Sequence, residues 1–384
     1  MKVLVNLLWL VPGVVGGSED SVTDALRAVA ALDEPDLDVR LAVLSSFPAA
    51  HPDLAARFPC EVSALDGADK ARRVLAEQTW LASTARRVGA EVVHHAGGVS
   101  PLVSPAPTVL TIHDLQPLDL PDNFTPTKRA YINAMVGRSA RSARVVCVPS
   151  EFTRSRVVEL LRVPADRVRV VPWYVAGDRG RDDGDPPAEA ATPTRRTVPE
   201  RPRGPYFLYP AITYPHKQHV QLVDAFALLA RDDPSVSLVL TGGEGPSEER
   251  VRSRIRSHGL DGRVVRTGRV SRERLESLYA GAAAVTVPSN YEGFGLPALE
   301  AMVRGCPVIA ADAGSLPEVV APGDLVAASD VTAWADAMQS VLQLSARERA
   351  ARIAVGHDLA ARFTPLRTAT DLVAAYRRAA VTST

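Results

Sequence analysis

The sequence predicts an α/β protein built from two doubly wound parallel sheets. The chain has 384 residues, which is enough for two domains and a remainder. Hydrophobic residues make up 46% of it and charged residues 23%, the balance of a globular chain rather than a disordered one. Short apolar runs alternate with amphipathic segments in both halves. This order is typical of parallel sheets that are covered by helices.

The first half opens with an apolar run, Lys2–Leu10, that predicts a buried parallel strand. A loop with Gly16 and Gly17 follows, and then an amphipathic stretch, Glu19–Leu32, that predicts a helix. Further strands are expected at Val39–Leu44, Glu91–His95, Val109–His113, Val145–Pro149 and Val168–Val171. Further helices are expected at Lys70–Val88, Thr127–Ser142 and Ser150–Leu161.

Residues 177–204 separate the two halves. This stretch is rich in Gly, Pro, Asp and Arg and has almost no large apolar side chain, which indicates a linker or an exposed loop. After it, strands are expected at Tyr206–Ile212, Ser237–Thr241, Val264–Thr267, Ala283–Val287 and Val308–Ala311. Helices are expected at His219–Arg231, Ser247–His258, Arg272–Ala280, Pro297–Arg304, Val331–Leu344 and, at the tail, Thr364–Ala380.

Charge and cysteine content exclude several classes of protein. The 44 basic and 44 acidic residues give no net charge, which argues against a general nucleic-acid binder. Cys60, Cys147 and Cys306 show no paired spacing, so we expect a reducing compartment and neither a disulfide framework nor a metal site. We see no secretory signal and no membrane-spanning run, and therefore expect a cytoplasmic protein.

The stretch 127–144 leaves one membrane interpretation open. It combines several Lys and Arg side chains with apolar ones, and such a face could touch anionic lipid at the inner side of the membrane. A solvated helix with one packed face explains the same pattern, and we favour that interpretation.

The strongest functional signal is the segment Ser289–Glu300, which follows a predicted strand. Gly293 and Gly295 let the backbone approach a ligand, and the helix that follows offers N–H groups to an anion. Glu292 and Glu300 flank this anion site. Two carboxylates beside a phosphate cradle suit a sugar nucleotide, one for ribose hydroxyls and one for the sugar. A Gly-rich turn with an acid near the helix start explains the spacing about as well.

Weaker signals follow other predicted strands. His113 ends one strand, and Lys217, one of only four lysines, comes after another. Both are candidates because ligands of doubly wound sheets bind beyond the carboxyl ends of the strands. Gly16 and Gly17 could bring N–H groups to a diphosphate. Each also has a plainer interpretation: a structural histidine, a solvated lysine and an ordinary turn.

Glu292 and Glu300 form an E-x7-E pattern, and the surrounding EGFGLPALEAMVRGCPVIAADAGSLPEVV closely resembles the family-4 retaining glycosyltransferases of GT-B fold. Weaker similarity extends over nearly the whole chain. The resemblance implies two Rossmann-like domains that face a central cleft. Residues 1–176 would bind the acceptor, 177–204 would be a linker, 205–363 would bind the nucleotide sugar, and 364–384 would return as a helix to the N-terminal domain.

The resemblance also implies an activity. We expect retaining, metal-independent transfer of a hexose, mannose favoured, to an acceptor hydroxyl, with formation of an alpha-glycosidic bond. The Tyr-Pro-His-Lys stretch at 214–217 is similar to that of mannosyltransferases, so GDP-mannose is the first expected donor and a UDP-sugar the second. The acceptor can be a carbohydrate, a lipid-linked sugar or a small molecule. No resident cofactor is expected.

Individual residues receive roles from the same resemblance. Lys217 is expected to neutralise the leaving diphosphate, Glu292 to bind sugar hydroxyls and His113 to contact the donor sugar or its phosphate. The other donor-binding residues are expected to be Gly16, Gly17, His216, Gly293, Phe294, Gly295, Leu296, Glu300 and Val270.

Ile212 is a departure from the family pattern. The family usually has an Arg at this place, and His216 could take over part of its function. The departure leaves a second interpretation open, a catalytically weakened GT-B protein that acts as a binding partner of another transferase.

Overall fold

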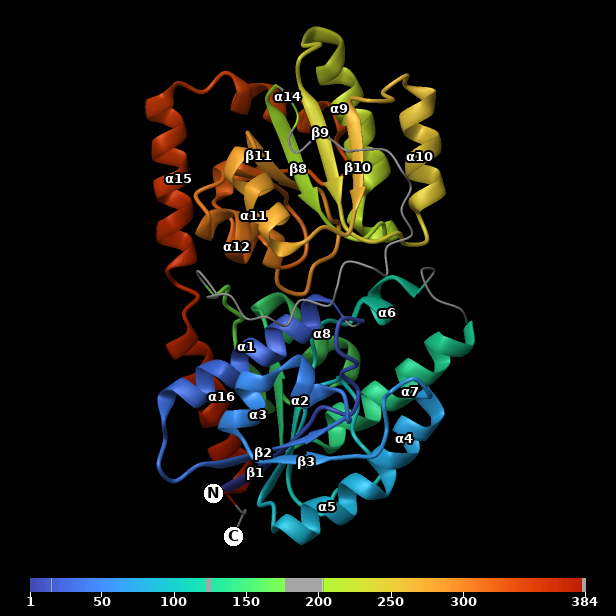
Figure 1. The fold of residues 1–384 in the computed structure, drawn as a ribbon, viewed down its shortest axis with the longest axis vertical. Helices are drawn as coiled ribbons and strands as arrows, with labels where there is room; N and C mark the ends of the chain where they lie inside the picture. Colours follow the sequence, from blue (N-terminus) through green and yellow to red (C-terminus); the bar gives the residue numbers. More distant parts are fainter. Residues whose placement is uncertain (15, 122–125, 177–201, 203, 382–384) are drawn as a thin grey trace. The chain divides into compact units, whose positions relative to one another are not determined.

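The computed structural model divides into two compact units (Figure 1). The first unit comprises Met1–Gly184 together with Phe363–Thr384, and the second comprises Asp185–Arg362. The structure describes residues 1–14, 16–121, 126–176, 202 and 204–381. The predicted linker, 177–204, lies almost wholly outside the described residues.

The first unit is built on a parallel sheet with the strand order β3-β2-β1-β4-β5-β6-β7. The strands are β1 (Lys2–Asn6), β2 (Asp38–Val43), β3 (Cys60–Val62), β4 (Val92–His95), β5 (Thr108–Thr111), β6 (Val145–Val148) and β7 (Val168–Val170). β1 and β4 are buried along almost their whole length, as expected for strands that helices cover on both faces.

Helices of the first unit pack around this sheet (Figure 1). They are α1 (Gly17–Leu32), α2 (Phe47–Ala50), α3 (Pro52–Arg57), α4 (Lys70–Gln78), α5 (Trp80–Val88), α6 (Gln116–Asp119), α7 (Pro126–Ser142), α8 (Glu151–Leu161) and α16 (Pro365–Ala380). Helix α16 comes from the far end of the chain and packs against α1. Tyr376 and Ala379 of α16 join the same apolar core as Val3 and Val5 of β1.

Two predicted elements of the first unit differ substantially from the structure, whereas the others are shifted by no more than two residues at either end. The run Lys2–Leu10 is a strand only as far as Asn6, because the Asn6 Oδ1 accepts a hydrogen bond from the Leu8 N–H and turns the chain. Leu8 and Leu10 are still fully buried, so the apolar run predicted burial correctly and conformation wrongly. The helix expected at Lys70–Val88 is two helices, broken at Thr79.

The second unit is built on a parallel sheet with the strand order β10-β9-β8-β11-β12-β13. The strands are β8 (Tyr206–Pro210), β9 (Ser237–Thr241), β10 (Val264–Gly268), β11 (Ala284–Val287), β12 (Val308–Ala311) and β13 (Leu325–Val326). The helices are α9 (His219–Asp232), α10 (Glu248–Ser257), α11 (Arg272–Gly281), α12 (Leu296–Val303), α13 (Leu316–Val319), α14 (Val331–Leu342) and α15 (Ala346–Ala360). A short 3-10 turn, Pro215–Lys217, follows β8.

Helix α15 was not predicted from the sequence. Its start has a full capping box, in which the Ser345 hydroxyl accepts from the Glu348 N–H and the Glu348 carboxylate accepts from the Ser345 N–H. Of the helices that the structure describes, none combines the length and the apolar character needed to cross a bilayer.

Candidate active site

The second sheet reverses its direction of winding at β8. The chain leaves β8 towards β9 and β10, and it then returns to β11 on the other side of β8. In open α/β sheets, ligands bind beyond the carboxyl ends of the strands at such a switch point. The segment after β8 carries His216 and Lys217, and the segment after β11 carries Glu292. Three of the predicted site residues therefore come together at the most suitable edge of this sheet.

Lys217 and Glu292 form an ion pair at this edge. The Lys217 Nζ lies 2.6 Å from the Glu292 Oε1, and the two side chains are only 17% and 10% exposed. The positive charge offsets the carboxylate, so an anion at this edge meets a neutral pair instead of a bare negative charge. The pairing explains how an acidic residue can stand beside an anion-binding segment.

Tyr209 is hydrogen bonded to both of the loops that carry this pair. Its hydroxyl donates to the Lys217 carbonyl oxygen at 3.0 Å and shares a hydrogen bond with the Ser289 Oγ at 2.9 Å. A third contact joins the same loops, since the Asn290 N–H donates to the His216 carbonyl oxygen at 3.0 Å. Burial raises the pKa of Tyr209 well above its ordinary value, so the phenol stays protonated at neutral pH. Buried hydrogen bonds thus set the separation of the two loops.

The loop after β12 holds the backbone of Glu292 in place through hydrogen bonds and close packing. The Ser315 N–H and hydroxyl donate to the Glu292 carbonyl oxygen at 3.2 and 3.0 Å. Gly314 lies directly against the same residue: a Cβ at position 314 would come 2.8 Å from the Glu292 nitrogen and 2.9 Å from its oxygen. Only glycine leaves room for this approach, so Glu292 is fixed from two sides.

Residues Gly293–Leu296 lead into the first turn of α12. Gly295 has a φ of 101°, in the left-handed region, and a Cβ there would lie 2.9 Å from the Leu316 side chain. Phe294 is buried and anchors the segment, so its contribution to a ligand would come from its backbone. The N–H groups at the start of α12 form the kind of site that binds phosphate.

Glu300 lies about one turn into α12 and is half-buried. Its Oε2 accepts a hydrogen bond from the hydroxyl of Tyr279 on α11, at 2.6 Å. Burial raises the pKa of Tyr279 well above its ordinary value, and the negative charge of Glu300 raises it further. The second carboxylate of the E-x7-E pattern therefore has a neutral hydrogen-bond donor in Tyr279, and its charge also interacts with the guanidinium of Arg304.

His216 lies next to the ion pair in the sequence, whereas Val270 lies farther along the same edge of the sheet. His216 precedes Lys217 and is buried, and burial together with the charge of Lys217 lowers the pKa of its imidazole to about 4. The ring is uncharged at neutral pH, so it adds no positive charge in place of an arginine at Ile212. Val270 follows β10, which is two strand positions from β8, roughly 10 Å across the sheet. Val270 therefore lies at the same edge of the sheet as the ion pair, but at a different strand.

His113 belongs to the first unit and lies two residues after β5. Its Nε2 donates to the Ala96 carbonyl oxygen at 2.8 Å, which leaves Nδ1 as an acceptor. Within the described part of the chain, this buried Nδ1 has no hydrogen-bond partner. Trp9 and Trp173 contact the ring at centroid distances of 5.8 and 5.4 Å. Burial lowers the pKa of His113 to about 4, so a neutral acceptor of this kind suits a hydroxyl better than a phosphate.

Gly16 and Gly17 form the start of α1 in the same unit, with Gly16 as the N-cap residue. Glu19 in the first turn folds back on this loop. Its Oε2 accepts from the Gly13 N–H at 2.8 Å, and its Oε1 is hydrogen bonded to the His51 Nε2 at 2.9 Å. The glycine loop is therefore tied to an acidic residue that the sequence analysis passed over.

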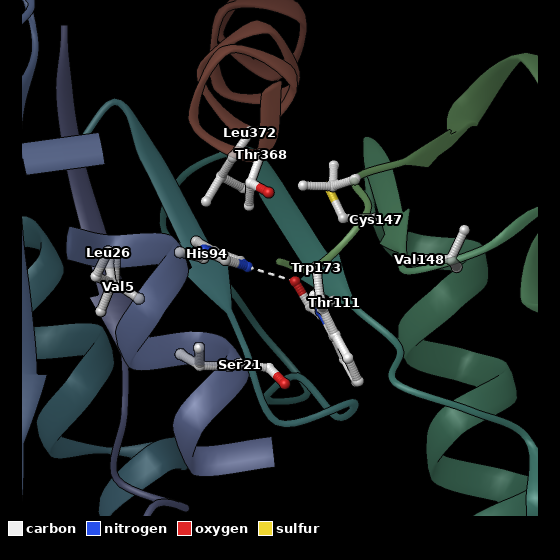
Figure 2. Close-up of a pocket in the computed structure, with 13 residues that line it drawn as sticks. Val5, Ser21, Leu26, His94, Thr111, Cys147, Val148, Trp173, Thr368 and Leu372 are labelled. Carbon is white, nitrogen blue, oxygen red and sulfur yellow. Dashed lines mark hydrogen bonds between the residues drawn. The ribbon is translucent and has the colours of Figure 1, made fainter. Parts of the chain in front are cut away.

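A small cavity lies beside α1 and α16 in the first unit (Figure 2). Its volume is about 30 Å³, which is room for one or two water molecules and not for a sugar ring. Figure 2 shows the His94 ring aimed at Thr111, and the His94 Nε2 lies 2.7 Å from the Thr111 Oγ1. Its Nδ1 is hydrogen bonded to the Tyr376 hydroxyl at 2.9 Å. Since no predicted site residue lines this cavity, we assign no function to it.

Tyr209, Tyr279 and Ser315 were missed by the sequence analysis. The two tyrosines lie in apolar strand and helix patterns, where an aromatic residue predicts core packing, and both are indeed almost fully buried. Their hydroxyl contacts depend on which strands and helices are neighbours, and a local pattern does not contain that information. Ser315 lies in the longer stretch that resembles the family, and nothing in the sequence distinguished it from its neighbours.

Family models match both units of the chain. Residues 15–179 match the model described as Glycosyltransferase Family 4, and residues 192–355 match Glycosyl transferases group 1. The D-inositol 3-phosphate glycosyltransferase of Actinosynnema mirum is 33% identical over 298 residues, which cover 73% of this chain and 67% of that relative. The chain belongs to glycosyltransferase family 4. Glu292 and Glu300 both lie within the part of this family-4 chain that matches Glycosyl transferases group 1.

This family-4 chain is also similar to a second curated relative and to a solved structure. The O-antigen chain mannosyltransferase B of Escherichia coli is 33% identical over 243 residues, and the match spans 62% of each chain, less than two thirds of that relative's length. Among solved structures, HepE of Anabaena in complex with UDP and glucose aligns with a TM-score of 0.69 at 20% identity, over 98% of this chain and 99% of that one. The predicted GT-B class of two parallel-sheet α/β domains is confirmed.

Proposed function

We propose that the protein transfers a hexose, mannose favoured, from a nucleotide sugar to an acceptor hydroxyl, with retention and formation of an alpha-glycosidic bond. The observation that carries the proposal is the Lys217–Glu292 ion pair, held at the switch point of the second sheet beside the start of α12. Membership of family 4 supports the reaction class.

The donor diphosphate is proposed to bind the N–H groups of Gly293–Leu296 and the ammonium of Lys217. Negative charge gathers on the diphosphate as the sugar–phosphate bond breaks, and fixed donors lower the barrier most when they face that charge. The Lys217 Nζ carries three N–H donors, so it can keep Glu292 and still contact a phosphate oxygen. Because these groups supply positive charge, we propose that transfer needs no metal ion.

Glu292 is proposed to accept hydrogen bonds from sugar hydroxyls and to steady the positive charge that develops at the reacting carbon. Its backbone clamp by Gly314 and Ser315 favours a catalytic role, because a group that must face a transition state has to be held in place. Glu300 is proposed to accept from the ribose hydroxyls.

The first unit is proposed to bind the acceptor. His113 would accept a hydrogen bond from a sugar hydroxyl through its neutral Nδ1, and Gly16 and Gly17 would offer N–H groups to the diphosphate. The acceptor is a carbohydrate, a lipid-linked sugar or a small molecule, and a location in the cytoplasm or at the inner face of the membrane suits all three.

Two donors are proposed in order. GDP-mannose comes first, because the Escherichia coli relative is named a mannosyltransferase and the stretch 214–217 is similar to that of mannosyltransferases. A UDP-sugar comes second, because HepE was crystallised with UDP and with UDP-glucose. The backbone near Val270 is proposed to contact the base.

The purified chain tests this proposal without a known acceptor. GDP and UDP are titrated separately by calorimetry, and GDP-mannose and UDP-glucose are each incubated with the protein while release of the nucleoside diphosphate is followed. We expect binding of one nucleotide and slow hydrolysis of the matching donor. Binding of a nucleotide without any hydrolysis or transfer would favour the catalytically weakened binding partner, and binding of no nucleotide would reject the proposal.

A further inference from the structure

A buried tyrosine on α11 contacts the second carboxylate of the motif. The Tyr279 hydroxyl donates to the Glu300 Oε2 at 2.6 Å, and the tyrosine is 1% exposed. Tyr279 is not one of the proposed donor-binding residues.

The tyrosine ring is itself held in place. The guanidinium of Arg304 lies over it, 4.8 Å from the ring centroid. Two hydrogen bonds of 2.6 and 2.5 Å fix that guanidinium to the carboxylate of Glu276 on α11, and a third, of 3.0 Å, joins it to the Glu300 carbonyl oxygen. Helices α11 and α12 are therefore bound together around the hydroxyl, and the direction in which it points is fixed.

We propose that Tyr279 is a positioning residue that orients the Glu300 carboxylate towards the ribose hydroxyls of the nucleotide. This inference rests on the proposed donor site. A carboxylate has two oxygens with about four acceptor positions, and the phenolic donor takes one position on Oε2 and restricts the rotamer of the side chain. The phenol is neutral, because burial raises its pKa well above the ordinary value, so it donates to Glu300 without adding a charge to the site. A charged acceptor of fixed orientation suits the two O–H donors of a ribose diol.

A cycle of ligand and protein variants tests the inference. Wild type and Tyr279→Phe are titrated by calorimetry with GDP and 2′,3′-dideoxy-GDP, and with UDP and its dideoxy analogue. We expect wild type to bind one ribonucleotide more tightly than its dideoxy form. In Tyr279→Phe the ribonucleotide should weaken by about tenfold while the dideoxy form is unchanged, because only the ribonucleotide uses the oriented carboxylate.

Tyr206→Phe is the matched control. The Tyr206 hydroxyl is also buried and donates to a carbonyl oxygen of α11, that of Leu278, at 2.8 Å, whereas the Tyr279 hydroxyl donates to the Glu300 carboxylate. The control should lose a similar amount of stability, seen as Tm, and keep the preference for the ribonucleotide.

The remaining outcomes separate the inference from the proposed function. Equal weakening of both ligands in Tyr279→Phe, or an unchanged preference for the ribonucleotide, would overturn the positioning role and leave the donor site intact. If wild type binds nucleotide but does not distinguish the ribose from its dideoxy form, the proposed role of Glu300 fails and the inference fails with it.

Discussion

Glu292 and Glu300 belong to one motif, but their closest side-chain partners differ in charge. Glu292 contacts the ammonium of Lys217, whereas Glu300 contacts the neutral hydroxyl of Tyr279. The first carboxylate forms a direct ion pair beside the segment that suits a diphosphate, whereas the second has a direct hydrogen bond from a neutral phenol and interacts with the charge of Arg304. A spacing pattern in the sequence makes the two residues look equivalent, whereas their partners differ, and this difference agrees with the separate roles proposed for them.

Replacing Glu292 should have the largest effect. Glu292→Ala removes the group proposed to stabilise charge at the reacting carbon, so turnover should fall at least about a hundredfold while the nucleotide still binds. Initial rates of donor hydrolysis and calorimetry measure the two quantities. Glu249→Ala, which removes an exposed glutamate of α10, is the control and should keep both. Full activity in Glu292→Ala would mean that Glu292 does not have the proposed catalytic role, and the proposed difference in role between the two carboxylates would then be wrong.

Glu300→Ala should produce the reverse pattern. Loss of a charged acceptor for ribose hydroxyls should weaken nucleotide binding by about ten- to a hundredfold, with turnover at saturating donor changed much less. The measurement is the split between KM for the donor and kcat. A variant that loses kcat and keeps KM would mean that both carboxylates act on the reacting centre.

The ion pair itself can be tested by a double-mutant cycle. Lys217→Met leaves the Glu292 carboxylate buried without its cation beside the anion-binding segment, so nucleotide affinity should fall. Adding Glu292→Gln removes that charge and should recover part of the binding, with a coupling free energy of about 1–2 kcal/mol. Additive effects in calorimetric titrations would show that Lys217 does not offset Glu292 in the bound state.

Removing divalent metal ions should have the smallest effect. If Lys217 and the N–H groups at the start of α12 supply the positive charge, EDTA should leave the initial rate of donor hydrolysis unchanged. Adding Mg²⁺ or Mn²⁺ afterwards should also leave it unchanged. A rate that EDTA abolishes and Mn²⁺ restores would contradict the metal-independent mechanism and shift the neutralising role away from Lys217.

The sequence predicted the fold class and the family, and both are confirmed. Ser237–Thr241 and Val308–Ala311 are strands with the predicted bounds, because each is a short apolar run between clear turn signals. Lys2–Leu10 was predicted too long, because apolar runs report burial and do not report the turn after Asn6, which a side-chain hydrogen bond from the Leu8 N–H to Asn6 and a backbone hydrogen bond from the Leu10 N–H to the Leu7 carbonyl oxygen form.

The sequence predicted that Lys217 and Glu292 would meet at one edge of the sheet, but it did not predict which side chains contact the candidate residues. Lys217 and Glu292 both follow strands, so their meeting at one edge of the sheet follows from a doubly wound fold. The contact between Tyr279 and Glu300 needs α11 and α12 to be neighbours, which tertiary packing decides. The roles assigned to all these residues stay predictions until the variants are measured.

Helix α16 has a consequence for the order in which the chain can fold on the ribosome. The first unit needs Phe363–Thr384, whereas the second is one continuous stretch that ends at Arg362. All of the second unit is therefore synthesised before the helix that carries Tyr376 and Ala379 into the first core. A nascent chain halted at Arg362 would contain every residue of the later unit and an earlier unit with part of its apolar core still uncovered.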